Sequence, residues 1–289
     1  MSKIKIIADS ACDITREAAQ QWNIEVLPLS LCHGQELYRD WYDFTPQQFY
    51  EKLYEWDPLP TTSQVTPPVF LDAYRRAVAD GYDSILVVCL NAAASGTCQS
   101  AAVARDMLLD DPACAHIQVE VIDSTTYAYL IGLHLERAAQ MAQEGHTLTE
   151  IADYLRDRYS RIQAYAAVYT LDFLKRTGRI NGAAGFVANL LDIKPILLIG
   201  NAEIRPVDKV RGKKKTAARL VQLVQQNIDP DSHELIIVHG DMPQELEQLR
   251  QLVAEAFPGF TVIESQMGSA IALHAGPHLL GLAFHKKLS

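Results

Sequence analysis

Short apolar runs alternate with helical patterns through the first half of the chain, and this alternation limits the fold more than any other feature. Residues 84–90 (SILVVCL) are apolar nearly throughout, which is typical of a strand covered on both faces of a parallel sheet. Similar runs at residues 3–10 and 119–124 are each followed by a helical pattern. The alternation predicts an α/β fold whose N-terminal sheet is parallel, doubly wound and Rossmann-like.

The second half of the chain changes character near residues 159–163. Strand-like segments follow one another there, and two long helices are expected at 214–227 and 243–257. We expect strands at residues 164–170, 192–199, 202–210, 234–240, 261–268, 269–276 and 279–284. Gly200-Asn201 fits a hairpin turn between two of them. We therefore predict a parallel α/β domain over residues 1–160 and a C-terminal α/β domain with a mixed sheet over residues 161–289.

Charge and cysteine content exclude several classes of protein. The formal net charge of -9 argues against broad binding to nucleic acid or to anionic membranes. The chain has 5 cysteines and no CxxC motif, so a disulfide scaffold or a structural zinc site is not expected. The start has no signal-peptide pattern, and no apolar stretch reaches the ~18–20 residues of a membrane span. These features predict a soluble protein of the cytoplasm.

Polar residues end three of the expected parallel strands. The first ends in Asp9-Ser10, the second leads into Ser95-Gly96-Thr97, and the third ends in Asp123-Ser124. Ligands of open parallel sheets bind at the carboxyl ends of the strands. We therefore expect a binding site at this edge.

The segment Ser95-Gly96-Thr97 allows two interpretations of equal weight. At the start of a helix, its hydroxyls and the free N–H groups would bind an anion, but Ser and Thr are also common helix N-caps. A catalytic serine is less favoured because Ala93 and Thr97 replace the glycines of G-x-S-x-G. Cys98 would have a lowered thiol pKa at a helix start, although no base is evident for it.

Two further segments carry candidate ligand-binding side chains. Thr62 and Ser63 belong to a hydroxyl-rich stretch, for which a solvated loop is the simpler interpretation. His274 follows an apolar run and lies four residues before His278, but Gly276-Pro277 would break a helix between them, so a metal site is not expected. His274 is either a hydrogen-bond donor to an anion or a histidine of the core.

Basic residues are concentrated in two segments of the second half. Residues 209–219 contain Lys209, Arg211, Lys213, Lys214, Lys215 and Arg219, and residues 175–179 contain Lys175, Arg176 and Arg179. Lysines that open a helix oppose its macrodipole by ~0.3–1 kcal/mol each. Either an anionic group or an acidic protein surface docks on residues 213–215, or these side chains form a solvent-screened face.

These segments together resemble the DegV family of bacterial fatty-acid-binding proteins, which are carrier subunits of a fatty acid kinase. The resemblance runs through the whole chain. Its segments are ADSACDI (8–14), VLPLSL (26–31), TTSQVTP (61–67), ASGTCQSA (94–101), VIDS (121–124), TLDFLKRTGRI (170–180), LLDIKPIL (190–197), KVRGKKK (209–215) and HAGP (274–277). No single segment identifies the family, but the occurrence of all of them in this order does.

The resemblance implies a DegV-type fold of two α/β domains with one long-chain fatty acid buried between them. The fatty-acid carboxylate would be bound by Thr62, Ser63, Ser95, Gly96, Thr97 and His274. Residues 181–191, which are rich in small side chains, would leave room for the acyl chain.

The resemblance also implies that the chain itself is not an enzyme and needs no cofactor or metal. A partner kinase would phosphorylate the bound fatty acid to an acyl-phosphate for phospholipid synthesis. Kinase or phosphate docking would then fall to Arg176, Arg179, Arg211, Lys213 and Lys214. An acyl-transfer or hydrolase enzyme that uses Ser95 or Cys98 remains the alternative.

Overall fold

The computed structural model describes residues 3–178 and 192–287. Its contacts divide the chain into two compact units, the first Met1–Thr45 with Pro58–Tyr159, the second Pro46–Asp57 with Ser160–Ser289. We describe each unit by itself. Within the described ranges, no helix has both the length and the apolar character needed to cross a bilayer.

A four-stranded parallel sheet forms the centre of the first unit. Its strand order is β2 (Ile24–Leu27), β1 (Ile4–Asp9), β6 (Ser84–Cys89) and β7 (Gln118–Asp123), and all neighbouring pairs are parallel. Every residue of β6 is buried. The predicted parallel sheet is therefore confirmed.

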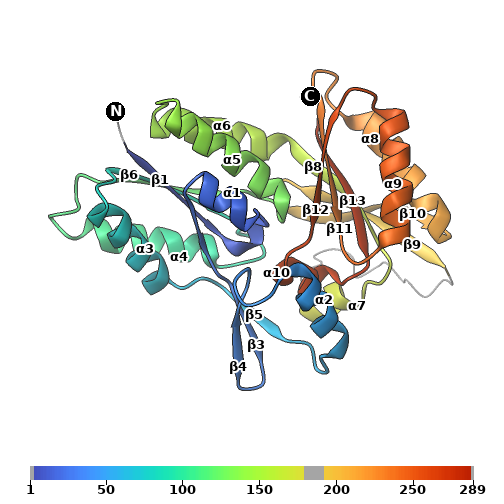
Figure 1. The fold of residues 1–289 in the computed structure, drawn as a ribbon, viewed down its shortest axis with the longest axis horizontal. Coiled ribbons are helices and arrows are strands. Elements are labelled where there is room, and N and C mark those ends of the chain that lie inside the picture. The colour runs from blue at the N-terminus through green and yellow to red at the C-terminus, as the bar shows by residue number, and fades with distance from the viewer. Residues whose placement is uncertain (1–2, 179–191, 288–289) are drawn as a thin grey trace. The chain divides into compact units, whose positions relative to one another are not determined.

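Helices cover both faces of this sheet. They are α1 (Arg16–Gln21), α3 (Pro67–Ala79), α4 (Thr97–Leu109), α5 (Tyr129–Gln143) and α6 (Leu148–Arg161). Within this unit, α5 and α6 lie on one side of the sheet, and α3 and α4 on the other (Figure 1). The chain thus winds in both directions from β1, and the carboxyl ends of β1 and β6 lie at the point where it reverses.

A small antiparallel sheet completes the first unit. Its order is β4 (Glu36–Arg39), β3 (Ser30–His33) and β5 (Thr61–Ser63). Thr61–Ser63, for which a loop was the simpler interpretation, forms a short strand because its backbone pairs with β3, with Ser63 opposite Ser30. Thr62 and Ser63 are therefore held on a sheet.

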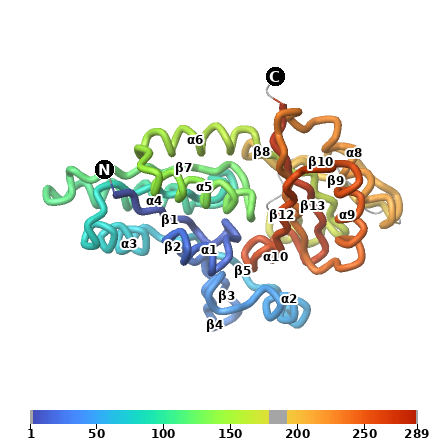
Figure 2. Tube along the Cα trace, turned by 45° about the horizontal axis from the view of Figure 1, so that its top comes forward, coloured from blue at the N-terminus to red at the C-terminus, as the bar shows by residue number. Residues whose placement is uncertain are grey.

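The second unit contains a mixed six-stranded sheet, as predicted. Its order is β10 (Glu203–Arg211), β9 (Ile193–Gly200), β8 (Ile162–Val168), β13 (Leu279–His285), β11 (Glu234–His239) and β12 (Thr261–Gln266). Only the β11–β12 pair is parallel among the pairs that the described residues form in this sheet. The tube in Figure 2 follows these strands with α8 and α9 beside them.

The helices of this unit are α2 (Pro46–Glu55), α7 (Asp172–Thr177), α8 (Thr216–Asn227), α9 (Pro243–Ala256) and α10 (Ser269–Ala275), with the short 3-10 helix η3 (Lys213–Lys215) before α8. The core between helices and sheet includes Leu220, Leu249 and Leu280, each without exposed surface.

The strand predicted at residues 269–276 is wrong, because α10 occupies them. A short apolar run is ambiguous between a strand and a buried helix. Gly276 and Pro277, which directly follow the run, are residues that commonly end a helix. Their position therefore indicates that the run itself is helical.

Helix α2 groups with the second unit, although the sequence analysis placed it within residues 1–160. The Tyr50 hydroxyl donates to the carbonyl of Met267 at 3.2 Å, and the Tyr54 hydroxyl donates to Asp241 at 2.9 Å. These bonds join α2 to segments around 200 positions later in the chain, a pairing that local sequence patterns do not encode.

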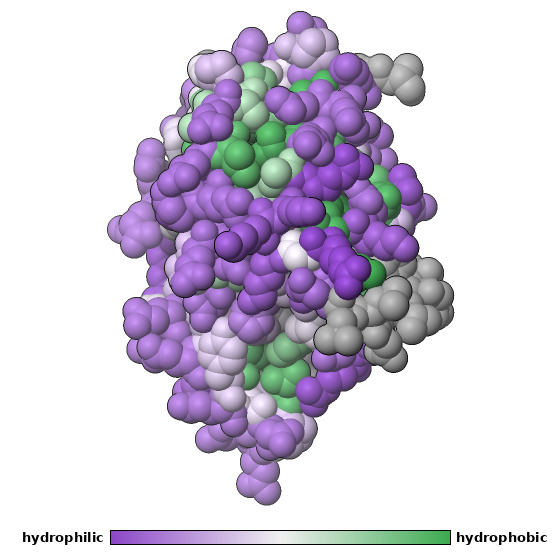
Figure 3. All heavy atoms as spheres, turned by 90° about the vertical axis from the view of Figure 1, so that its right-hand side faces the viewer, coloured by the Kyte–Doolittle hydropathy of each residue, from purple (hydrophilic) through white to green (hydrophobic). Residues whose placement is uncertain are grey.

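The large apolar side chains that remain exposed are spread over several elements. Leu37 lies on β4, Val69 on α3, Met107 on α4, Val207 on β10 and Val262 on β12. Polar side chains cover most of the face seen in Figure 3, where apolar side chains form separate patches. Scattered exposed apolar residues of this kind are usual for a folded domain.

Candidate functional site

The carboxyl end of β1 is fastened to the chain that follows β6. Asp9 ends β1, and its two carboxylate oxygens accept different backbone N–H groups, Leu90 at 2.7 Å and Ala11 at 3.0 Å. Ser10, the next residue, donates to Asp40 at 2.5 Å and accepts the N–H of Leu29 at 2.9 Å. The Asp9-Ser10 pair therefore holds neighbouring backbone in place.

Asp123 does the same at the end of β7. One of its oxygens, Oδ1, accepts the N–H of Ala92 at 3.1 Å and that of Thr125 at 2.8 Å. The Asn91 side chain donates to the Tyr127 hydroxyl at 2.7 Å. Bonds from both neighbouring strand ends thus fix the start of the segment that leads to Ser95.

Asp9 faces the interior of the unit, whereas Asp123 is only partly buried. Asp9 is 1% exposed, and its burial raises the pKa of its carboxyl to about 7, although the two N–H donors oppose that rise. The three strand ends do meet at one edge, as predicted from their parallel order. The carboxylates there bind the protein's own backbone.

Ser95 and Thr97 share a hydrogen bond between their hydroxyl oxygens at 2.9 Å. Helix α4 begins at Thr97, whose backbone N–H donates to Ser95 Oγ at 3.3 Å. The N-cap of α4 is Gly96, without a side-chain capping bond, so the interpretation of Ser95 or Thr97 as the N-cap is wrong. Thr97 is fully buried, whereas Ser95 is only half-buried, so Ser95 is the hydroxyl of the pair that a ligand would reach more readily.

Gln64 connects the hydroxyl-rich segment Thr61–Ser63 to the start of α4, which lies far from it in the sequence. Its side-chain amide donates to Ser100 Oγ at 2.9 Å, in the first turns of α4. A Cβ atom on Gly96 would lie 2.1 Å from Gln64 Oε1, so only glycine fits there without displacing Gln64. Thr62 and Ser63, which directly precede Gln64, are thereby placed beside the start of α4.

Cys98 is next to this hydroxyl pair and interacts with Cys89. The interaction of the two thiols lowers the pKa of Cys98 and raises that of Cys89. Ser95 pairs with a hydroxyl and Cys98 with a thiol. Neither partner is a general base of the kind that activates a nucleophile.

In the second unit, Gly240 and Gly276 allow close packing of the backbone around residues 274–277. His274 lies at the end of α10 and is partly exposed. A Cβ on Gly240 would lie 2.0 Å from the carbonyl oxygen of Pro277, and a Cβ on Gly276 would lie 2.8 Å from the Phe173 ring. His274 therefore belongs to the last turn of a helix and not to a strand end.

His278 follows α10 and its C-cap Gly276. His278 is exposed, and its Nε2 lies 3.4 Å from the Tyr54 hydroxyl. Across residues 3–178 and 192–287, no group of three or more His, Cys, Asp or Glu side chains could hold a metal ion.

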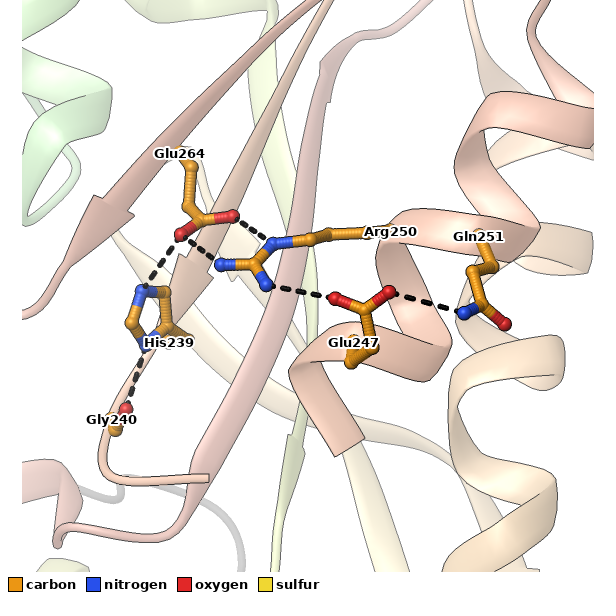
Figure 4. Close-up of polar contacts among 6 residues, drawn as sticks. All are labelled: His239, Gly240, Glu247, Arg250, Gln251 and Glu264. Atoms are coloured by element: carbon orange, nitrogen blue, oxygen red, sulfur yellow. Dashed lines mark hydrogen bonds and ion pairs between the residues drawn. The ribbon is translucent and has the colours of Figure 1, made fainter. Parts of the chain in front are cut away.

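A network of ion pairs at the carboxyl ends of β11 and β12 was not predicted. Arg250 on α9 donates to both oxygens of Glu264, at 2.7 and 2.8 Å, and to Glu247 at 3.0 Å. Glu264 also lies 3.6 Å from His239, and Figure 4 shows the side chains converging from α9, β11 and β12. Arg250 lowers the pKa of Glu264 and of Glu247.

Four of the five basic residues predicted to dock a partner are described, and all four are exposed: Arg176, Arg211, Lys213 and Lys214. Lys213 and Lys214 belong to η3, immediately before α8, as predicted. Lys213 lies 3.9 Å from Glu245. Arg179 and the predicted small-residue segment 181–191 lie outside the described residues.

Comparison with known proteins gives a consistent family match. The family model described as "Uncharacterised protein, DegV family" matches residues 3–287. A DegV domain-containing protein of Caldanaerobacter subterraneus is 31% identical over 288 residues, which cover 99% of this chain and 100% of the relative. One from Clostridium acetobutylicum is 32% identical over 289 residues, covering 99% and 100%.

Solved structures agree in fold over the whole length. A DegV family protein from Thermus thermophilus, described by its fatty acid binding, superposes with a TM-score of 0.86 at 27% identity, covering 99% of this chain and 100% of that one. DegV from Bacillus subtilis, described as a fatty acid binding protein, gives a TM-score of 0.85 at 27% identity with the same coverage.

Proposed function

This chain belongs to the DegV family, and from that premise we propose that it binds one long-chain fatty acid and presents it to a fatty acid kinase. The similar proteins from Thermus thermophilus and Bacillus subtilis, both described as binding fatty acids, support the ligand class. The chain would carry out no chemistry itself, need no cofactor, and act in the cytoplasm.

The observation that carries the proposal is the hydroxyl pair of Ser95 and Thr97 at the start of α4. A carboxylate away from water needs hydrogen-bond donors, or it takes up a proton. Hydroxyls and the first N–H groups of a helix supply such donors without a charge of their own. Gln64, the residue after Thr62 and Ser63, contacts Ser100 and Gly96 of the same segment, and we add His274 because the resemblance of segment 274–277 includes it.

The hydrogen bonds that the acidic side chains make with backbone N–H groups also support binding of a carboxylate. Asp9 and Asp123 lie at the same sheet edge as Ser95, but each is engaged by backbone N–H groups. Burial also raises the pKa of Asp9 to about 7, so part of its charge is removed by protonation near neutral pH. A second carboxylate there would otherwise be repelled.

The acyl chain would provide most of the binding free energy. Each buried methylene contributes about 0.8 kcal/mol, so a long chain contributes on the order of 10 kcal/mol before ordering costs are subtracted. The carboxylate contacts would then fix the orientation of the ligand. We therefore expect substitutions of the carboxylate-binding residues to lower the affinity for fatty acid while the unit stays folded.

Lipid extraction with mass spectrometry tests the ligand. We expect one fatty acid per chain in the purified protein, and loss of most of it in the double variant Ser95→Ala/His274→Ala. Loss of one hydrogen bond to a charged group corresponds to a Kd about 10- to 100-fold higher. The matched control is Ser232→Ala/His116→Ala, because both residues lie outside the proposed site. Full lipid retention in the first variant would overturn the carboxylate assignment.

The kinase step is tested by charge reversal. Arg211→Glu with Lys214→Glu should slow acyl-phosphate formation by a fatty acid kinase while the bound lipid stays in place. Arg205→Glu, an exposed arginine on the same strand β10, is the control. Equal rates in both variants would remove the docking role from Arg211 and Lys214.

A further inference from the structure

The hydroxyl pair at the start of α4 has a fixed number of hydrogen-bond donors and acceptors. A hydroxyl group has one proton to donate and two lone pairs that accept. Ser95 Oγ lies 2.9 Å from Thr97 Oγ1 and also accepts the backbone N–H of Thr97 at 3.3 Å. Ser95 is partly exposed, whereas Thr97 has no exposed surface, so only Ser95 is open to a further partner.

Burial determines which of the two hydroxyls donates to the other. Within residues 3–178 and 192–287, Thr97 Oγ1 has one hydrogen-bond partner, Ser95 Oγ. If Ser95 donated, the Thr97 proton would be buried without an acceptor, which is unfavourable. Thr97 is therefore the donor. Ser95 Oγ then accepts two bonds, from the hydroxyl and from the N–H of Thr97, and keeps its own proton for another acceptor.

The neighbouring backbone restricts movement of this pair. A Cβ on Gly96 would lie 2.1 Å from Gln64 Oε1, so the Gln64 side chain packs directly against the residue between the two hydroxyls. Gln64 is itself bonded to Ser100 Oγ at 2.9 Å, and the N–H of Ser100 donates to the carbonyl of Gly96 at 2.9 Å. Ser95 and Thr97 are thus held in register by contacts on both sides of Gly96.

We propose that Thr97 is a positioning residue that makes Ser95 a donor-only group, so that the site selects ligands with an acceptor-only head group. The inference rests on the proposed function, in which Ser95 binds the carboxylate of a fatty acid. With both lone pairs of Ser95 occupied, a head group that has to donate a proton finds no acceptor there. An ionised carboxylate only accepts, and its charge strengthens the bond from Ser95. Thr97 acts through Ser95 and does not itself contact the ligand.

Substitutions at position 97 separate the hydroxyl from the volume of the side chain. Thr97→Val keeps the shape and loses the hydroxyl, Thr97→Ala loses both, and Thr97→Ser keeps the hydroxyl. The delipidated full chain is titrated at neutral pH with oleate and with oleylamine, whose head groups only accept and, as the ammonium form, only donate. We expect Thr97→Val and Thr97→Ala to bind oleate about fivefold more weakly and oleylamine no more weakly than the wild type.

The ratio of the two dissociation constants is the readout that a purely structural role would not change. The Kd for oleylamine divided by that for oleate should fall about fivefold or more in Thr97→Val and Thr97→Ala, and it should keep its wild-type value in Thr97→Ser. Equal weakening of both ligands would overturn the proposal, because it would reflect lost packing of the segment. A lowered ratio in Thr97→Ser would overturn it as well, since that variant retains the donor.

A double-mutant cycle tests whether Thr97 acts through Ser95. We expect Ser95→Ala to raise the Kd for oleate about 10- to 100-fold, and Ser95→Ala/Thr97→Val to match Ser95→Ala within about twofold. Additive losses in the double variant would indicate that Thr97 contacts the ligand directly and would overturn the positioning role alone. Unchanged oleate binding in Ser95→Ala would instead overturn the carboxylate assignment of the proposed function, together with the positioning role that depends on it.

Discussion

The two units use carboxylates in opposite ways at the carboxyl ends of their strands. In the first unit, Asp9 is buried and bound by backbone N–H groups, and its carboxyl pKa is raised to about 7. In the second unit, Glu264 is partly exposed and bound by Arg250, which lowers its pKa. Burial in the first unit reduces the negative charge of Asp9, and an ion pair in the second neutralises that of Glu264.

This difference predicts opposite responses of the two units to pH. A carboxyl with a raised pKa in the folded state contributes stability that is lost as pH rises through that pKa. A carboxyl with a lowered pKa contributes stability that is lost as pH falls below the ordinary value near 4.5. The first unit should therefore weaken on the alkaline side and the second on the acidic side.

Asp9 should give the largest effect. Between its ordinary value of 3.8 and about 7, each pH unit removes about 1.4 kcal/mol, so the loss from acid to above pH 8 is on the order of 4 kcal/mol. Amide hydrogen exchange of β1 and β6 at a series of pH values, corrected for the intrinsic rate, measures this directly.

Asp9→Asn removes the titration and should flatten that pH dependence. Its amide leaves one of the two N–H groups without an acceptor, because Leu90 and Ala11 bond to different oxygens, so its stability should be lower at neutral pH. Asp72→Asn, on an exposed face of α3, is the control. An unchanged pH profile in Asp9→Asn would show that Asp9 does not set the alkaline limit.

Alanine substitutions at Gly240 and Gly96 provide the second test, with an intermediate expected loss of stability. In Gly240→Ala the new Cβ would meet the backbone carbonyl of Pro277, whereas in Gly96→Ala it would meet the end of the Gln64 side chain. Backbone yields less easily than a flexible side chain, so we expect a loss of about 2–3 kcal/mol at Gly240 and about 1 kcal/mol at Gly96. Urea unfolding measures both, and a larger loss at Gly96 would contradict the order.

Glu264 should give the smallest effect. Glu264→Gln removes the bidentate pair with Arg250 at a partly exposed position, where solvent screening keeps the expected loss below about 1 kcal/mol. The loss should diminish as pH falls below the ordinary value of 4.5 and should shrink in high salt. Hydrogen exchange of β12 measures it, and Gln244→Ala, at an exposed position of the same helix, is the control. A loss that persists unchanged at low pH would contradict the ion-pair origin.

Much of the fold follows from the sequence because apolar periodicity and strand–helix alternation are local signals. The parallel sheet, the mixed sheet and the helix around residues 216–227 were all predicted from such signals. The strand predicted at residues 269–276 was wrong because a short, mostly apolar run fits a buried helix equally well. Strand β5 was missed because its pairing with β3 depends on residues far away in the chain.

The direction of the acidic side chains was also missed, although a local signal exists. Asp9 accepts the N–H of Ala11, and Asp123 accepts that of Thr125, two residues onward in both cases. This is the turn that aspartate favours after a strand, and it marks the carboxylate as a backbone acceptor. The contacts of Gln64 with Ser100 and of Cys89 with Cys98 carry no such signal.

The position of α2 in the chain has a consequence for synthesis. Helix α2 is made before most of the first unit, yet its tyrosines bond to Met267 and Asp241 of the second. During translation the first unit can close around its sheet once Tyr159 has left the ribosome, while α2 must wait for the C-terminal strands. A fragment that starts at Ser160 would lack this helix, so the second unit cannot be obtained intact by a single cut.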